Sequence, residues 1–124
     1  MTYSLLVHNC GFNAESVAQP AYELNVPAFA VKGSCSLMPF ANVDKPNIII
    51  ETVKPAEDDT DAYILRAYEC EGTKTNCSIE LSTSVNKTVI TNLLEDEKET
   101  VCSQNRILKL NFRPFEIKTI KVYR

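Results

Sequence analysis

A period-two alternation of apolar and polar residues is the feature that most constrains the fold of this chain. Leu108, Leu110 and Phe112 alternate with Lys109 and Asn111. Because successive side chains of a strand point to opposite faces, this pattern predicts a strand with one buried and one exposed face. We therefore expect the chain to fold around β-sheets rather than around helices.

Other segments are rich in β-branched and aromatic residues, and turn-forming residues separate them. The predicted strands are 3–7, part of 31–40, 48–53, 63–69, 77–81, 88–91, 108–112 and 116–123. The acidic residues 57–61 predict an exposed loop between two of these strands. Short strands separated by turn signals predict an all-β fold, an antiparallel β-sandwich with long connections.

Two stretches are compatible with a short helix. Residues 13–19 begin with Asn13, a residue type that caps helices, and Pro20 is predicted to end the helix. Residues 93–98 are long enough for about one turn. We expect at most one or two short helices in a single domain that spans residues 1–124.

Length and charge limit the classes of partner. The 124 residues are enough for one domain with a real core. Thirteen basic residues are scattered among sixteen acidic ones, for a net charge of −3. Nucleic acids and anionic membranes bind clustered Lys and Arg, so neither is an expected partner. The N-terminus does not resemble a signal peptide, and Ile48–Ile50 is too short to span a bilayer. We expect a cytoplasmic protein.

The five cysteines are an odd number without CxxC spacing, and one histidine cannot complete a Cys/His zinc set. We therefore expect no metal site. Cys70 and Cys77 flank residues 71–76, which are interpreted as a hairpin tip. A disulfide between them is geometrically possible. Free thiols in a reducing compartment are the expectation, because no secretory signal is recognised.

The sequence offers no catalytic residue or cofactor site. A serine or cysteine hydrolase needs a histidine to activate its nucleophile, and His8 has no Gly-x-Ser-x-Gly motif to serve. Gly11, Gly33 and Gly72 stand too far apart for a phosphate-binding loop. We expect His8 to be a structural histidine at the domain edge.

Two charged residues interrupt an apolar strand, and at least one of them is expected to be partly buried. These residues are Arg66 and Glu69. A structural ion pair with the acidic strand ends is one interpretation. The other is that Arg66 is presented to a sugar hydroxyl or to a neighbouring domain. Arg66, Tyr68 and His8 are accordingly the candidate substrate-binding residues.

Six short strings occur in one order along the whole chain. They are Tyr3-Ser4-Leu5-Leu6 followed by His8, then residues 21–27, 53–57, 65–69, 92–95 and 114–119. This ordered series resembles the carboxy-terminal β domain of glycoside hydrolase family 38, the α-mannosidases. The chain departs from many relatives at Val7, where they carry proline, and at Cys10 and Phe12, in a stretch where they carry glycine and tryptophan.

The resemblance implies a larger enzyme that hydrolyses α-linked mannose with retention. Such enzymes use an aspartate nucleophile and a zinc ion held by His and Asp, all in an amino-terminal catalytic domain. None of those motifs occurs in this sequence. The implied partners are that catalytic domain and, through it, a mannose-containing oligosaccharide. Met1 is then expected to begin a fragment rather than the enzyme.

The leading hypothesis is a non-catalytic domain that packs on the catalytic core and shapes the rim of the substrate cleft. An independent carbohydrate-binding module is the alternative, but it would be expected to show a Trp or Tyr platform, and the chain has no Trp. An immunoglobulin-like domain would need a Cys…Trp…Cys core.

An excised domain is expected to self-associate weakly through the face it has lost. The candidates for that face are Tyr3, Leu5, His8, Tyr22 and Leu24, and the alternative is that these residues fill the core.

Overall fold

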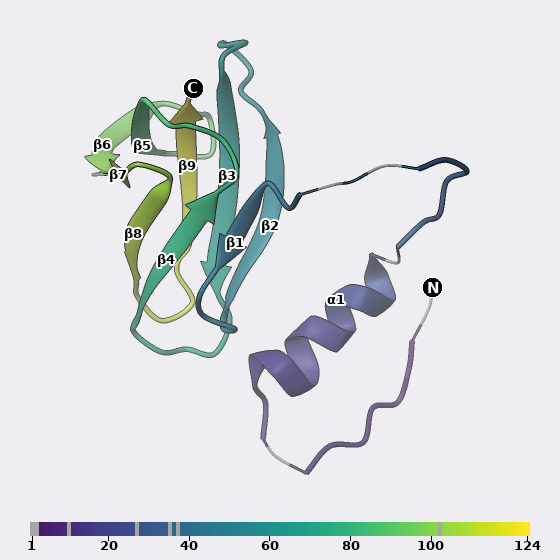
Figure 1. The fold of residues 1–124 in the computed structure, drawn as a ribbon. Helices are drawn as coiled ribbons and strands as arrows, with labels where there is room; N and C mark the ends of the chain where they lie inside the picture. The colour runs from purple at the N-terminus through teal and green to yellow at the C-terminus, as the bar shows by residue number, and fades with distance from the viewer. Residues whose placement is uncertain (1–2, 10, 27, 35, 37, 102) are drawn as a thin grey trace.

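Two antiparallel sheets pack face to face in the computed structural model, which describes residues 3–9, 11–26, 28–34, 36, 38–101 and 103–124 (Figure 1). The strands in these residues are β1 (Ala41–Val43), β2 (Ile48–Pro55), β3 (Ala62–Glu69), β4 (Thr75–Leu81), β5 (Lys87–Thr91), β6 (Glu97–Val101), β7 (Ser103–Gln104), β8 (Ile107–Phe112) and β9 (Ile117–Tyr123). With one short α-helix, the fold is the predicted all-β sandwich.

The strand order differs between the two sheets. One sheet has four strands in the order β1-β4-β8-β7, and the other has five in the order β2-β3-β9-β5-β6. Every described pair of neighbouring strands is antiparallel. The strands β2 and β6 therefore form the two edges of the five-stranded sheet.

The core lies between the sheets and follows the predicted alternation. On β8, Leu108, Leu110 and Phe112 are buried, whereas Lys109 and Asn111 are exposed. These three side chains belong to one buried cluster with residues of the opposite sheet, which include Leu65, Ala67, Ile120 and Val122. Full burial of a large apolar side chain stabilises a fold by roughly 1.5–3 kcal/mol.

Six predicted strands are confirmed, and they correspond to β2, β3, β4, β5, β8 and β9. The predictions for 3–7 and 31–40 were wrong, because the described residues there form no strand. The described residues of these segments pair with no strand of either sheet. The strands β1, β6 and β7 were not predicted. These strands are short or, in β6, almost wholly exposed, so they lack an apolar alternation.

The predicted helix exists, but Pro20 does not end it. A π-helical turn, η1 (Ala14–Ala18), leads directly into α1 (Gln19–Asn25). Asn13 caps the start as expected, because its side-chain oxygen accepts a hydrogen bond from the Ser16 backbone N–H at 2.8 Å. Pro20 lies in the first turn of α1, where proline is tolerated. Residues 93–98 form a turn and the start of β6 rather than a helix.

The hairpin predicted between Cys70 and Cys77 is wrong. The strands β3 and β4 lie in different sheets, so the connection between them crosses the end of the sandwich. Both thiols are buried and free. Burial, followed by the nearby Asp44 carboxylate, raises the pKa of the Cys77 thiol to about 11.

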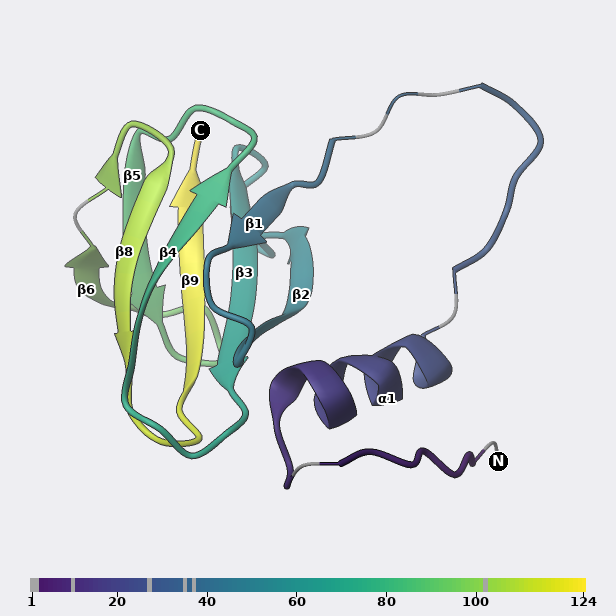
Figure 2. The ribbon, with the colours of Figure 1, turned by 60° about the horizontal axis from the view of Figure 1, so that its bottom comes forward.

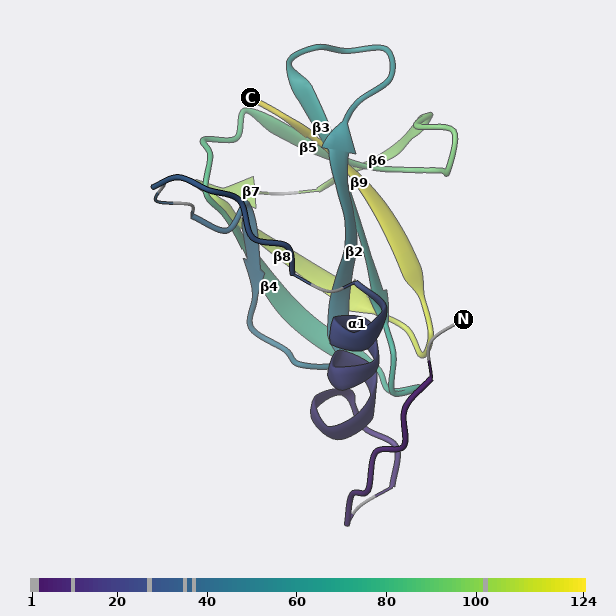
Figure 3. The ribbon, with the colours of Figure 1, turned by 90° about the vertical axis from the view of Figure 1, so that its right-hand side faces the viewer.

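The described residues between 3 and 34 lie outside the sandwich, whereas Phe40, just before β1, packs against its core. Figures 1 and 2 show α1 beside the β2 edge and a long extended connection from α1 to β1. Figure 3 shows the same helix in front of the end of β2. None of the described helices is long and apolar enough to cross a membrane.

Candidate functional site on the five-stranded sheet

The outer face of the five-stranded sheet carries two of the predicted site residues, Arg66 and Tyr68. Their neighbours Leu65 and Ala67 point into the core, so Arg66 and Tyr68 point away from it. In register, Arg66 lies between Thr52 of β2 and Thr119 of β9.

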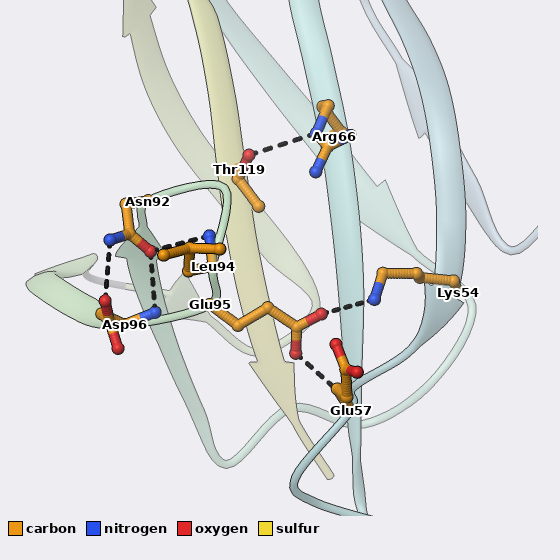
Figure 4. A network of polar contacts seen from close by, with 8 residues as sticks. All are labelled: Lys54, Glu57, Arg66, Asn92, Leu94, Glu95, Asp96 and Thr119. Atoms are coloured by element: carbon orange, nitrogen blue, oxygen red, sulfur yellow. Dashed lines mark hydrogen bonds and ion pairs between the residues drawn. The ribbon is translucent and has the colours of Figure 1, made fainter.

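Arg66 is held by hydrogen bonding rather than by a counter-ion. Its Nε donates to the Thr119 hydroxyl at 3.3 Å (Figure 4). Among the described residues no carboxylate forms an ion pair with Arg66. Glu69 cannot do so because it lies on the opposite face of β3. The arrangement leaves the half-buried Arg66 cation as a potential donor to a further group.

Tyr68 joins this face to the helix. Its hydroxyl shares a hydrogen bond with Tyr22 of α1, and burial, followed by the neighbouring Tyr22 and Cys70, raises the pKa of Tyr68. His8 is exposed and belongs to the segment 3–9, which lies on the side of α1 away from the sandwich (Figures 1 and 2). The structure thus brings Arg66 and Tyr68 onto one face but not His8.

A loop of residues 92–96, here called the Asn92 loop, crosses the same face (Figure 4). The Asn92 side-chain oxygen accepts hydrogen bonds from the Leu94 N–H at 3.0 Å and the Asp96 N–H at 2.9 Å. This pattern lets Glu95 adopt a left-handed backbone, with φ of 69°. The loop is therefore fixed by its own backbone hydrogen bonds.

The Glu95 carboxylate is buried beneath the Asn92 loop. It accepts a hydrogen bond from Lys54 Nζ of β2 and another from the Glu57 N–H at 2.9 Å (Figure 4). These two bonds, in that order, hold the pKa of Glu95 below its usual value. An asparagine that starts a tight loop was the available sequence signal for this structure.

One buried hydroxyl on this face has no hydrogen-bond partner among the described residues. The Thr91 Oγ1 atom makes no hydrogen bond with the described part of the chain. Thr91 pairs in register with Thr119, the residue that binds Arg66. A shallow hollow is lined by these two threonines together with Leu93 and Ile117. Lys98, Glu116 and Lys118 also line the hollow, so it combines hydroxyl, charged and apolar groups.

Glu69 forms a second polar centre, at the end of the sandwich. Its carboxylate accepts hydrogen bonds from three backbone N–H groups of the β3–β4 connection, those of Glu71, Gly72 and Thr73, at 2.8, 2.8 and 3.1 Å. It also accepts from the Phe115 N–H of the β8–β9 turn at 3.0 Å. Side-chain donors complete the set: Asn47 Nδ2 at 3.0 Å and the Thr73 hydroxyl at 3.2 Å.

These hydrogen bonds make Glu69 a structural group. Burial alone would raise the pKa of Glu69, but the N–H groups of Phe115 and Glu71, with Asn47, outweigh it and lower the pKa to about 2. A general acid or base works best with a pKa near the operating pH. Glu69 is therefore unsuited to proton transfer at neutral pH.

The described residues contain no group of three or more His, Cys, Asp or Glu side chains placed to hold a metal ion. The outer face instead offers the Arg66 cation, hydroxyl groups and exposed apolar side chains. Such a surface is suited to contact with another surface that combines polar and apolar groups.

Comparison with known proteins gives the family. A model of the glycosyl hydrolases family 38 C-terminal beta sandwich domain matches residues 47–120. Human alpha-mannosidase 2C1 is 34% identical over 94% of the chain and 12% of its own length. Mouse alpha-mannosidase 2C1 is 30% identical over 96% of the chain and 12% of its own length. Alpha-mannosidase G of Dictyostelium discoideum is 32% identical over 97% of the chain and 12% of its own length.

The chain thus spans about an eighth of the length of these curated relatives. The family model covers more than half of the chain and all of the central strands β3, β4 and β8. It follows that the chain belongs to glycosyl hydrolase family 38, as a C-terminal β-sandwich domain of its α-mannosidases.

Proposed function

We propose that the chain is a non-catalytic β domain that packs on the catalytic core of a larger α-mannosidase. The observation that carries this proposal is the exposure of large apolar side chains in residues 3–40. Leu5 is 90% exposed and Phe29 is 88% exposed, and Tyr3, Val7, Val31 and Met38 are also largely exposed. Apolar surface of this extent marks an interaction site.

The candidate interface residues of the N-terminal segment support this proposal. Tyr3, Leu5 and Leu24 are exposed and absent from the buried clusters, and His8 is exposed as well. Tyr22 is half-buried against Tyr68. Interfaces between domains of one chain commonly bury roughly 600–1,500 Å².

Catalysis by the larger enzyme is assigned to its catalytic domain. The zinc ion that family resemblance implies needs a set of His and Asp ligands, and the described residues provide no such cluster. A mannose-containing oligosaccharide would then reach this domain only at the rim of the cleft. Arg66 and Tyr68 are the candidate contacts, because they lie side by side on one sheet face.

The alternative function is an independent carbohydrate-binding module. Such a module stacks a free aromatic face on a sugar ring. Here the Tyr63 ring lies 5.2 Å from Phe40 and has the Arg124 guanidinium 4.3 Å above it. Lys87 and Lys121 lie over the Tyr123 ring. The Tyr63 and Tyr123 rings are therefore already in contact with other side chains, which makes these two tyrosines poor sugar platforms.

A cytoplasmic location is part of this proposal. The unpaired, buried thiols of Cys70 and Cys77 support it, because disulfides are rare in reducing compartments.

The size of the native product tests the proposal. An antibody raised against the exposed acidic loop 57–61 should detect a polypeptide several times heavier than 13.9 kDa in the source cells. Detection of a 13.9 kDa product alone would contradict it.

The purified 124-residue chain provides a second test. It should not hydrolyse an aryl α-mannoside, with or without zinc, and should bind no glycan of a mannose array. Zinc-dependent turnover that a point substitution in this chain abolishes would refute a non-catalytic role.

A further inference from the structure

Four exposed apolar residues lie on or beside the outer face of the five-stranded sheet, outside the N-terminal segment. Leu93 and Leu94 belong to the Asn92 loop, and Phe115 and Ile117 to the β8–β9 turn and the start of β9. Their exposed fractions are 69%, 81%, 69% and 62%. Here they are called the apolar patch. We infer that the apolar patch docks on the catalytic part of the same α-mannosidase polypeptide, an inference that rests on the function proposed above.

The patch is held rigidly although it is exposed. The Asn92 side chain fixes the backbone of Leu94, and the buried Glu95 carboxylate ties the loop to Lys54. The Glu69 carboxylate binds the N–H of Phe115. Residues held in one conformation before binding lose little entropy when they bind, as at well-formed interfaces.

Backbone strain accompanies this rigidity. Of the three described non-glycine residues with positive φ, Glu95 at 69° and Phe115 at 57° lie in the two turns that carry the patch. The Phe115 ring packs against Gly72, where a Cβ atom would lie 2.7 Å from the ring. Strained conformations persist where the surrounding structure fixes them, and they cluster at functional sites.

The patch is continuous with the surface of the N-terminal segment. Ile117 pairs in register with Tyr68, and Tyr68 bonds to Tyr22 of α1. Leu93 and Ile117 line the same hollow, in which the Thr91 hydroxyl has no described partner.

The two outer faces of the sandwich differ in character. The outer face of the four-stranded sheet carries Asn76, Ser78 and Glu80 on β4, which pair with Asn111, Lys109 and Ile107 on β8. The Asn76 and Asn111 side chains bind each other. That face is mainly polar and suits water, whereas the apolar patch lies on the side of the five-stranded sheet.

The length of the relatives indicates what docks on the apolar patch. The relatives extend far beyond the region that matches this chain, which covers 12% of each of them. Most of such a polypeptide therefore lies outside the 124 residues. The Ala14 N–H, at the start of the helical segment, donates to the Glu71 side chain at 2.7 Å. Residues 3–40 thus approach the sandwich at the Gly72 end, where Phe115 lies.

Hydroxyl-radical footprinting tests the inference on unmodified protein. The isolated 124-residue chain and the larger polypeptide are labelled under matched conditions, and oxidation of each side chain is read by mass spectrometry. Docking should reduce oxidation of Leu94, Phe115 and Ile117 about fivefold in the larger polypeptide, as expected for burial in an interface core. Ile107, which is 41% exposed on β8, is the control and should be oxidised equally in both.

Three other results would overturn the inference. Equal oxidation of the patch in both proteins would leave the proposed function standing but reject this face. Protection that appears in the isolated chain as its concentration rises would assign the patch to a second copy. Source cells that contain only the 13.9 kDa product would reject both the proposed function and the inference.

Matched aspartate substitutions give an independent readout. Ile117→Asp should lower the thermal midpoint of the larger polypeptide but leave that of the isolated chain unchanged. Ile107→Asp should change neither. A loss of stability of the isolated chain with Ile117→Asp would show that Ile117 supports the sandwich itself, and the inference would fail.

Discussion

Replacing Glu69 by glutamine should destabilise the sandwich more than any other change that keeps the size of a polar side chain. Each Glu69 oxygen accepts three hydrogen bonds. A glutamine amide has only one oxygen, so its NH2 group must face three N–H or O–H donors. These donors come from both the β3–β4 connection and the β8–β9 turn, so both connections should loosen.

The magnitude follows from the pKa of the carboxyl group. The pKa of Glu69 is about 2 in the folded chain, against its ordinary value of 4.5. Each pKa unit corresponds to about 1.4 kcal/mol, so the charged form stabilises the fold by about 3 kcal/mol. Glu69→Gln should remove this amount, which corresponds to a fall of roughly 10 °C in Tm for a domain of this size.

The sign of the pH dependence is also fixed. Because the folded pKa is depressed, the stabilisation is complete above pH 4.5 and is lost as the pH falls from 4.5 towards 2. Urea unfolding at pH 7 and at pH 3 measures both effects. From pH 7 to pH 3 the free energy of unfolding should fall by more for the unmodified chain than for the Glu69→Gln variant. Glu80→Gln, at an exposed position of β4, is the control. A Glu69→Gln variant within 1 kcal/mol of the unmodified chain, or one with the same pH slope, would refute the assignment.

Three further outcomes are expected. Gly72→Ala should destabilise the chain by about 1–3 kcal/mol, because φ is +73° and the new Cβ would meet the Phe115 ring at 2.7 Å. Thermal unfolding measures the effect, and Gly11→Ala is the control because nothing lies within 4 Å of its new Cβ. Equal thermal midpoints for the two variants would contradict the reasoning. Tyr22→Ser should weaken self-association in analytical ultracentrifugation while leaving Tm nearly unchanged, since Tyr22 lies outside the sandwich core; a large fall in Tm would place it in the core. All five thiols should be alkylated without reductant in unfolded, freshly prepared protein, whereas Cys77, with its thiol pKa raised to about 11, should react slowly in the folded chain; a peptide joining Cys70 to Cys77 would show the opposite.

The central strands could be predicted because their residues obey a local rule. On β8 the residues that face the core alternate with residues that do not, and the pattern alone marks the buried face. The strand β3 is equally clear, and its alternation places Arg66 outward and Leu65 inward. These strands fix both the fold class and the position of two of the three candidate site residues.

The same rule gave a wrong prediction for the N-terminal segment. Residues 3–7 are largely apolar and were predicted to form a strand. In the structure they are exposed and form no strand. Apolar composition indicates that a segment packs against other apolar groups, but it does not show whether those groups belong to the same chain. The sequence therefore could not distinguish a core strand from a surface for another domain.

The Glu69 centre could not be predicted because it is non-local. Its donors come from residues 47, 71–73 and 115, which only the topology brings together. The supposed hairpin between Cys70 and Cys77 failed for the same reason. Two strands that follow each other in sequence lie in different sheets here, and no local pattern encodes that choice.

The edges of the five-stranded sheet decide how the isolated chain behaves at high concentration. An unpaired edge is a template on which another chain can add a strand, and charge or irregularity discourages such growth. At one edge, β6 carries Glu97, Lys98 and Glu99 in a row of exposed residues. At the other, the β2 ladder is broken between Ile50 and Thr52 and ends at Pro55, which has no N–H to offer. Both edges of the five-stranded sheet thus resist fibrillar polymerisation, so copies that meet at this sheet do so through side chains, which a point substitution can remove.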